Sequence, residues 1–382
     1  MRSAVIVEAK RTPVGRGVKG AYAATRPEQL GSVVIEALKP LLKDWSSLED
    51  VLVGCAMPEG EQGMNMARLI SFRAGLPITA GAATINRFCG SSQETMLMAA
   101  RAILANAGDL FLTGGVESMS KVPMMGFNPS VDPYISETFP AAYCSMGITA
   151  ENLAKEYKIS RKEQDEFAFQ SHQKAAAAWK AGKYDKEIVR FETKGLDGKL
   201  FTLQQDECVR ADTSLEKLGT LKPAFLAEGT VTAGNSSPVT DGAAFLLVME
   251  ESLAKSLGLK PRARIINGAV AGVEPDRMGI GPVPAVKKVL DRAGLKLDQI
   301  DAIELNEAFA AQSIAVIREG GYDMAKVNAW GGAIAIGHPL GASGARIITT
   351  LLNRLETDGG KYGIATMCIG GGQGIASVIE KI

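Results

Sequence analysis

Short apolar runs of strand length alternate with amphipathic helical patterns through the first third of the chain. The apolar runs predict buried strands at 4–7, 48–53, 82–85 and 110–113. The helical patterns between them predict helices at 27–42, 65–74 and 91–107. Because strands that alternate with helices are typical of α/β proteins, we predict an α/β fold with a mostly parallel sheet.

The last third of the chain repeats this order of elements. We predict a helix at 284–293, a strand at 302–305, a bend and helix start at 330–346, and strands at 362–368 and 375–380 around a glycine turn. Matched points in the two series stay about 250 residues apart, as expected of a duplicated fold. The repetition therefore predicts two similar α/β halves.

One difference between the two series locates a middle domain. In the second series the glycine turn leads at once into a closing strand, whereas the equivalent strand of the first series, 243–250, comes only after 120–240. We predict a first half at 1–119 and 241–250, an inserted domain at 120–240, and a second half at 251–382. Loops raised on a rigid sheet commonly carry substrate contacts, so we assign the insertion to ligand binding.

Composition and charge narrow the class of protein. The 382 residues are 46% hydrophobic, and the 42 Lys and Arg balance the 42 Asp and Glu, so no net field attracts nucleic acid or an acidic membrane. The five Cys include no C-x-x-C pair, which favours free thiols in a reducing compartment. The first residues lack the pattern of a signal peptide, and the longest apolar runs are too short to span a membrane. We expect a soluble, cytoplasmic protein.

Cys89 is the first candidate for chemistry. It lies in a bend between the strand 82–85 and a helix that we expect to begin at Ser91, where Ser91 and Glu94 have the S-x-x-E spacing of a capping box. A helix N-terminus favours negative charge and can lower the pKa of a thiol, which would make Cys89 a nucleophile. The alternative is a small, buried, apolar cysteine.

The chain has two histidines, which limits the choice of a base. His172 lies in a charged helical segment, and we expect its side chain to face solvent. His338 lies in a glycine-flanked bend before Pro339 and is the counterpart of Cys89 in the repeat. If the halves pack about a pseudo-twofold axis, Cys89 and His338 face one crevice as a nucleophile and its base.

Two further residues follow predicted strands of the second half. Cys368 ends the strand 362–368 and opens a glycine run whose backbone N–H groups can approach a ligand, although a buried Cys beside a hairpin turn fits equally. Asn306 follows the strand 302–305 and, taken alone, fits a helix N-cap better than a catalytic role. We assign no role to Cys55, Cys144 or Cys208.

Nucleotide and metal sites have little support in the sequence. Gly337, Gly341 and Gly344 do not form G-x-G-x-x-G, and the chain contains no G-x-x-x-x-G-K-[ST]. Cys89, His338 and Cys368 lack the clustered spacing of zinc ligands and an evident fourth ligand, so we expect no metal.

Five motifs give the chain a close resemblance to the thiolases, over essentially its whole length. They are INRFCGSS (85–92), TAGNSSPVTDGAA (232–244), NEAFAAQ (306–312), GGAIAIGHPLGASGAR (331–346) and ATMCIGGGQG (365–374). The resemblance implies a duplicated five-layer α/β/α/β/α fold, an inserted loop domain that grips coenzyme A, and homodimers or tetramers. It implies coenzyme A as a co-substrate and no permanently bound cofactor.

The resemblance also implies roles for individual residues. Cys89 is the expected acyl-accepting nucleophile, His338 the group that activates it, and Cys368 the acid and base for the second substrate. Asn306, through a water, joins His338 in one oxyanion hole, and the backbone N–H groups of Cys89 and Gly370 form the other. The implied substrate-binding residues are Ser237 and Arg210 for coenzyme A, Met146 and Phe309 in the walls of the tunnel, and Phe225 and Ala308.

Departures from the biosynthetic members of the family indicate the substrate class. Ser145 stands before Met146 where short-chain biosynthetic members commonly carry His, and Arg87 and Phe88 before Cys89 resemble the degradative class, as does GPVPA at 281–285. This implies a 3-ketoacyl-CoA thiolase of fatty-acid β-oxidation, with a hydratase/dehydrogenase as a possible partner. The alternative is a biosynthetic acetyl-CoA acetyltransferase that forms acetoacetyl-CoA.

Two hypotheses from other classes fit less well. A decarboxylating ketoacyl synthase would share the duplicated fold and the nucleophilic Cys, but it usually needs a second His or a different pairing at its site. A lipid-binding module without chemistry would be expected to lose the Cys or the His, and Cys89 and His338 are both present.

Overall fold

The β-strands of both halves of the chain form one sheet of ten strands in the computed structural model, which describes residues 2–382. The strands of the first half are β1 (Ala4–Arg11), β2 (Gly15–Arg16), β3 (Asp50–Gly54), β4 (Gly81–Ile85), β5 (Leu110–Ser118) and β8 (Thr240–Glu250). Those of the second half are β9 (Ala263–Gly272), β10 (Ala302–Leu305), β11 (Tyr362–Ile369) and β12 (Gln373–Lys381).

The strand order joins the two halves at one point. It runs β10-β11-β12-β9-β1-β8-β5-β3-β4, with β2 paired to β8. Val5 and Ile6 of β1 pair with Arg264 and Ala263 of β9, and this short antiparallel contact connects the two series of strands. The predicted repetition of elements is therefore visible as two groups of strands that meet at β1 and β9.

The predicted mostly parallel sheet is wrong. Among the described residues, the pairs β3–β4, β3–β5 and β10–β11 are parallel, and the remaining pairs of the large sheet are antiparallel. The closing strands cause the difference: β12 returns on β11 through a tight glycine turn, and β8 returns on β5 after the insertion. Alternation of strands and helices indicates the α/β class but not the direction of every pair.

Helices cover both groups of strands. In the first half they are α1 (Pro27–Leu38), α2 (Met66–Arg73), α3 (Ser91–Leu104) and α8 (Glu251–Ser256), with the 3-10 turns η1 (Lys39–Leu41), η2 (Gly60–Gln62) and η3 (Phe88–Gly90). In the second half they are α9 (Pro282–Ala293), α10 (Ala310–Gly320), α11 (Ala333–Ile336) and α12 (Ser343–Asp358), with η5 (Pro275–Ile280), η6 (Leu297–Gln299) and η7 (Leu340–Ala342).

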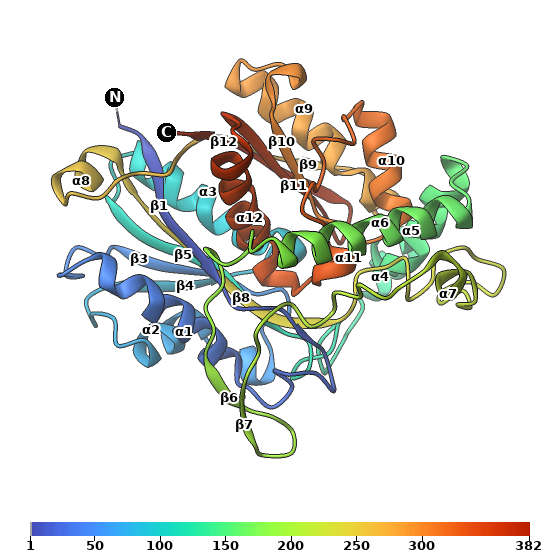
Figure 1. Cartoon of the computed structure of the whole chain (residues 1–382), viewed down its shortest axis with the longest axis horizontal. Helices are drawn as coiled ribbons and strands as arrows, with labels where there is room; N and C mark the ends of the chain where they lie inside the picture. The colour runs from blue at the N-terminus through green and yellow to red at the C-terminus, as the bar shows by residue number, and fades with distance from the viewer. Residues whose placement is uncertain (1) are drawn as a thin grey trace.

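The helices and strands stack in five layers. Helices α3 and α12 pack on each other at the centre of the molecule, between the two groups of strands, while α1 and α2 cover one outer face and α9 and α10 the other (Figure 1). The first four residues of β1 are all apolar because both faces of the strand are covered: Ala4 and Ile6 face the central core, and Val5 and Val7 face the outer core. This arrangement confirms the predicted five-layer α/β/α/β/α fold.

A glycine allows the two central helices to cross closely. A Cβ atom on Gly344 of α12 would lie 2.3 Å from the backbone nitrogen of Gln93 in α3, closer than real side chains approach. The N–H of Ala345 also donates to Ser92 Oγ across the same contact (2.9 Å). The close crossing brings the N-terminal ends of both helices together, and each of these ends follows a predicted site residue.

The segment between β5 and β8 runs around the outside of the layers, with its helices toward the right and its small hairpin at the bottom of the view (Figure 1). It contains α4 (Pro133–Thr138), η4 (Pro140–Tyr143), α5 (Met146–Glu156), α6 (Arg161–Lys180), the small sheet of β6 (Glu192–Lys194) and β7 (Leu200–Thr202), and α7 (Leu215–Gly219). Within residues 2–382, no helix combines the length and the apolar character needed to cross a membrane.

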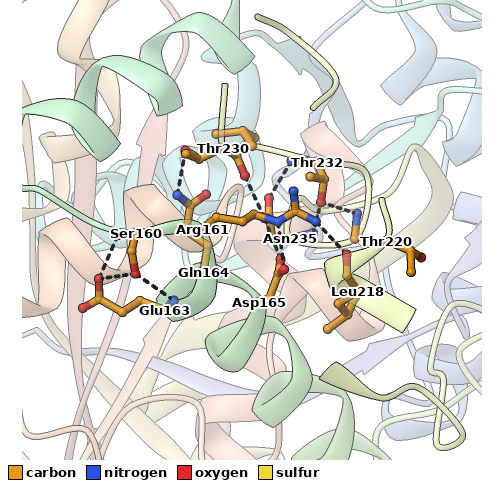
Figure 2. A network of polar contacts seen from close by, with 12 residues as sticks. Ser160, Arg161, Glu163, Gln164, Asp165, Leu218, Thr220, Thr230, Thr232 and Asn235 are labelled. Atoms are coloured by element: carbon orange, nitrogen blue, oxygen red, sulfur yellow. Dashed lines mark hydrogen bonds and ion pairs between the residues drawn. The ribbon is translucent and has the colours of Figure 1, made fainter. Parts of the chain in front are cut away.

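Polar contacts fix the end of this segment to α6 (Figure 2). Asn235 Nδ2 donates to Asp165 Oδ1 (2.9 Å), and Arg161 Nη2 of the same helix donates to the carbonyl of Leu218 (2.6 Å). The carbonyl of Asn235 then accepts from the N–H of Ala310, the first residue of α10 (2.9 Å). The chain that carries Ser236 and Ser237 is thereby held against the second half.

Candidate active site

Cys89 lies in η3, a single turn between β4 and α3. The N–H of Arg87 donates to Ser91 Oγ (2.9 Å), and this hydroxyl donates to the carbonyl of Phe88 (2.6 Å). Ser91 therefore braces the bend that carries Cys89 instead of capping α3. The predicted capping box is wrong, because the N-cap of α3 is Gly90 and the Glu94 carboxylate pairs with Arg101 (2.7 Å) and Arg87 (3.4 Å).

The residue before Cys89 has an unusual backbone. Phe88 has φ of 42°, in the left-handed region that bulky residues rarely adopt. The N–H of Phe88 donates to Asn86 Oδ1 (2.8 Å), which helps to hold this conformation. Backbone strain of this kind is typical of functional sites, where surrounding contacts maintain it.

Burial determines the state of the Cys89 thiol. Burial raises the pKa of Cys89 to about 11, against the opposing effect of the backbone N–H groups of Gly370 and of Cys89 itself. The predicted lowering of this pKa is wrong, since loss of water outweighs the backbone donors at this helix end. Cys89 therefore rests as a thiol and needs a base to become a nucleophile.

His338 is held in one tautomer. Its Nδ1 atom lies 2.6 Å from Ser343 Oγ, and the Ser343 hydroxyl donates to the carbonyl of Pro339 (2.8 Å). A hydroxyl has a single hydrogen to donate, so Ser343 accepts from Nδ1–H and the Nε2 atom keeps its lone pair. The backbone N–H of His338 donates to Thr240 Oγ1 (2.9 Å), which holds the bend at His338 against the first residue of β8.

Asn306 faces the free nitrogen of His338. Its Nδ2 atom lies 3.3 Å from His338 Nε2, and its backbone N–H donates to the carbonyl of Thr366 (3.0 Å). The N-cap interpretation of Asn306 is wrong, because α10 begins at Ala310 after an N-cap at Phe309. Burial, with a smaller contribution from Arg346, lowers the pKa of His338 to about 3, so the imidazole is neutral at neutral pH.

A buried carboxylate ties the His338 bend to the first half. Glu117 Oε2 on β5 accepts from the N–H of Gly341 (2.7 Å) and from the N–H of Ala56 (2.8 Å). The turn η7, which contains Gly341, also packs against η3. The bends that carry Cys89 and His338 are therefore in contact, although they come from different halves of the chain.

Cys368 and Gly370 also lie near Cys89, where β11 packs against η3. Cys368 is buried, and burial together with the nearby Cys89 thiol raises its pKa. A Cβ atom on Gly370 would lie 3.4 Å from Met146 Sδ and 3.7 Å from the Phe88 ring, so both side chains border this turn. The glycine at 370 leaves its N–H free to approach Cys89.

An apolar wall extends from this point into the insertion. Phe309 and Ala308 share a buried cluster with Cys368, and Met146 packs against it. The Phe225 and Phe309 rings meet edge to face, with centroids 5.9 Å apart. The N–H of Ser237 donates to the carbonyl of Ala308 (2.9 Å). The structure thus gathers five of the predicted substrate-binding residues around one wall.

Arg210 has a different environment. Its side chain is exposed, and its backbone N–H donates to Nδ1 of His172 (3.2 Å). The predicted solvent-facing position of His172 is wrong: the side chain is 5% exposed, and burial lowers its pKa to about 4. Tertiary contact with the segment after β7 buries a residue that lies in a charged helix.

Sequence reasoning missed four polar residues that hold this site together. They are Glu117, Ser343, Arg346 and Glu307, whose carboxylate accepts from Ser171 Oγ (2.6 Å) and Asn328 Nδ2 (2.8 Å) and anchors the Asn306 loop. A signal was available, because Ser343 and Arg346 are polar residues within the glycine-rich stretch that carries His338. Within the described part of the chain, no three Cys, His, Asp or Glu side chains are grouped to hold a metal.

Comparisons with known proteins agree over the whole chain. The family model described as "Thiolase, N-terminal domain" matches residues 4–252, and "Thiolase, C-terminal domain" matches 259–381. Proteins named 3-ketoacyl-CoA thiolase from Bacillus subtilis (strain 168) and Shewanella loihica are 48% and 51% identical, each over 100% of both chains. The crystal structure of the Bacillus anthracis acetyl-CoA acetyltransferase has a TM-score of 0.92 at 39% identity and covers 100% of this chain and 99% of its own.

Proposed function

The chain belongs to the thiolase family, and on this premise we propose that it is a degradative 3-ketoacyl-CoA thiolase of fatty-acid β-oxidation. The enzyme cleaves a 3-ketoacyl-CoA with coenzyme A into acetyl-CoA and an acyl-CoA that is two carbons shorter. The observation that carries this proposal is the contact between the turn that contains Cys89 and the turn that follows His338, which supports a shared site for the thiol and the neutral imidazole of the two halves.

The first half-reaction forms an acyl-enzyme. The Cys89 sulfur attacks the C3 carbonyl of the substrate while His338 Nε2 takes the thiol proton. The C2–C3 bond then breaks, the acyl group stays on Cys89, and the electron pair leaves as the enolate of acetyl-CoA. Cys368 donates its proton to the C2 carbon of this enolate, and acetyl-CoA departs.

The second half-reaction regenerates the enzyme. The Cys368 thiolate takes the proton of coenzyme A, and the coenzyme A sulfur attacks the acyl carbonyl on Cys89. When the tetrahedral intermediate collapses, the Cys89 sulfur leaves and recovers its proton from His338. Acyl transfer in two steps with product release between them predicts ping-pong kinetics.

Two sets of donors stabilise the charged oxygens in these steps. The backbone N–H groups of Cys89 and Gly370 both act on the Cys89 sulfur, so they are suited to the oxyanion of the tetrahedral intermediate. Asn306 Nδ2, beside His338 Nε2, is suited to the thioester oxygen of the enolate, through a bridging water. Removing one donor of this kind typically lowers kcat by about 10²- to 10³-fold.

The substrate-binding wall supports a long acyl chain. Met146, Phe225 and Phe309 present apolar surface next to Cys368, and Ser145 rather than a histidine precedes Met146. The Phe225 ring also fills the space against Gly147 of α5. We assign the exposed Arg210 side chain to the phosphates of coenzyme A and Ser237 to its pantetheine arm.

A comparison of kcat/KM for 3-ketodecanoyl-CoA and acetoacetyl-CoA tests the substrate class. We expect a preference for the ten-carbon substrate, and Phe225→Ala, which removes part of the apolar wall, should reduce it. Ser237→Ala serves as a matched control, because it should affect both substrates equally. A strong preference for acetoacetyl-CoA would instead support the biosynthetic acetyl-CoA acetyltransferase, the activity named for the structural relative.

Two surfaces support assembly with other chains in the cytoplasm. Strand β4 ends the large sheet with its outer edge unpaired among the described residues, and such an edge can pair with a second copy in a homodimer. The segment 124–143 exposes apolar side chains, including Met125, Phe127 and Tyr134, which fit a tetramer or a hydratase/dehydrogenase partner of β-oxidation. Light scattering of the pure protein and co-purification from cells would distinguish these assemblies.

A further inference from the structure

Arg346 is a buried cation behind the proposed site. It lies on α12, one turn after Ser343, and its side chain is almost fully buried. Its Nη2 atom lies 3.5 Å from Asn306 Oδ1, and its Nε and Nη1 atoms have no hydrogen-bond partner among the described residues. A charge buried with so few partners is destabilising unless the site makes use of it.

The neighbouring carboxylates are occupied by other arginines. Glu304 on β10 accepts from Arg354 Nη1 at 2.6 Å. Glu187 and Asp206 accept from Arg11, at 2.6 Å and 2.7 Å. Among residues 2–382, the hydrogen-bond contact of the Arg346 guanidinium is with the side-chain oxygen of Asn306.

The contact fixes the direction of the Asn306 amide. A guanidinium has only donors, so the amide oxygen must face Arg346 and the amide nitrogen must face His338 Nε2. Ser343 fixes the proton on the opposite nitrogen of the same ring. Ser343 and Arg346, one turn apart on α12, therefore fix the tautomer of His338 and the orientation of the Asn306 amide.

We propose that Arg346 is a positioning residue for the carbon–carbon bond step, where it holds the amide nitrogen of Asn306 toward His338 and the water that bridges to the enolate oxygen, and strengthens its N–H groups as donors by its fixed charge. The role rests on the proposed function. A cation next to the amide oxygen polarises the amide and makes its N–H groups better donors. Exchange of an acyl group between an acyl-CoA and Cys89 breaks no carbon–carbon bond and uses the backbone donors of Cys89 and Gly370, so it depends on Arg346 much less.

The same charge acts on His338. The charged and titratable groups that face Arg346 come from β10 (Glu304), from β1 (Arg11) and from the insertion (Asp206 and Tyr184). Of the charged groups, Arg346 is the one that acts on the His338 ring. It contributes, after burial, to the lowered pKa of His338. Removing the charge should therefore raise that pKa and move the acidic limb of the pH profile to higher pH.

The test uses the full-length enzyme with 3-ketodecanoyl-CoA and three variants. Arg346→Met keeps the length of the side chain and removes the charge; we expect kcat to fall about 10-fold or more, KM to change little, and the acidic limb of kcat/KM to move to higher pH. Arg346→Lys keeps the charge but loses the planar fork, so its kcat should fall while its acidic limb stays in place. The third variant, Asn306→Ala, removes the amide through which Arg346 acts. Each double variant, Asn306→Ala with Arg346→Met or with Arg346→Lys, should therefore have a kcat less than about 2-fold below that of Asn306→Ala alone.

The possible results separate the two proposals. Acylation of Cys89 by octanoyl-CoA breaks no carbon–carbon bond, so in Arg346→Met it should proceed at close to the wild-type rate, and it reports on the thiolase acyl transfer independently of Arg346. Wild-type kcat and pH profile in Arg346→Met, or a loss that adds in full to that of Asn306→Ala, would overturn the role of Arg346. If Arg346→Met does not fold, the double-mutant cycle of Arg346→Lys and Asn306→Ala decides the question, again by whether the two losses in kcat add in full.

Discussion

The hydroxyl of Ser343 lies 2.6 Å from Nδ1 of His338, and the hydroxyl's own hydrogen is committed to the carbonyl of Pro339. This relationship leaves Nε2 as the basic nitrogen, directed at Asn306 and away from α12. A base that must accept the proton of Cys89 needs its lone pair on this side of the ring.

We therefore predict that Ser343→Ala lowers kcat without a comparable change in KM. The variant releases the ring to take the other tautomer, and a correctly placed general base contributes roughly 10²–10⁴-fold, so a loss of about 10-fold or more is expected. Thr349→Val on the same helix is the matched control, because Thr349 Oγ1 also donates to a backbone carbonyl (Ala345, 2.7 Å) but does not touch His338. Equal losses in the two variants would show that only the helix is affected.

The pH dependence of kcat/KM should be flat through neutral pH. The pKa of His338 is lowered from 6.5 to about 3, so the neutral base persists as the pH falls and activity declines only well below pH 6.5. The raised pKa of Cys89, about 11, places the loss of the thiol proton far on the alkaline side. Initial rates in buffers of constant ionic strength would check this, and an acidic limb centred near 6.5 would contradict it.

Gly344→Ala should disrupt the crossing of the two central helices. The added methyl group would lie 2.3 Å from the backbone of Gln93, which cannot move away as a flexible side chain could. Overpacking of this kind typically costs about 1–3 kcal/mol, and here it should also separate the bends that carry Cys89 and His338.

Thermal unfolding and kcat would be measured together for this variant. Gly219→Ala at the end of α7 is the control, since nothing lies within 4 Å of its added methyl group and its backbone is not in the left-handed region. An unchanged melting temperature and kcat in Gly344→Ala would contradict the close crossing.

Arg11→Met should strongly destabilise the protein. Arg11 is fully buried and binds Glu187 and Asp206 of the insertion, so its loss leaves two carboxylates without their cation. Breaking a buried pair in this way typically costs about 3–5 kcal/mol.

The control for this prediction is Lys199→Met, which removes a solvent-exposed pair with Asp197 and should change stability by about 1 kcal/mol or less. Melting temperatures of the two variants would be compared at the same protein concentration. If Arg11→Met melted as late as Lys199→Met, the buried network would not be what fixes the insertion to β1.

Much of the fold was predictable because hydrophobic periodicity is a local signal. The strand β10 has the predicted bounds, and the second series of elements matches the first as expected. The sheet directions were not predictable in the same way. They depend on where β8 returns after the insertion, and a pattern of alternating elements does not contain that information.

The candidate site was predictable to the extent that its residues stand out in the sequence. Cys89 and His338 lie at matched bends of the repeat, and the bends are in contact. The protonation state and the solvent exposure of each group could not be predicted as well, because both depend on tertiary packing. Cys89 has a raised pKa although it lies next to a helix N-terminus, and His172 is buried by a backbone contact with Arg210, 38 residues away in the chain.

The central claim is that Cys89 accepts the acyl group with His338 as its base. The most direct test is mass spectrometry of the protein after brief exposure to 3-ketodecanoyl-CoA, with the adduct mapped to a peptide. We predict an acyl group two carbons shorter than the substrate on Cys89, absent in Cys89→Ser and formed much more slowly in His338→Ala. An adduct on another cysteine, or turnover that proceeds in Cys89→Ser, would contradict the account.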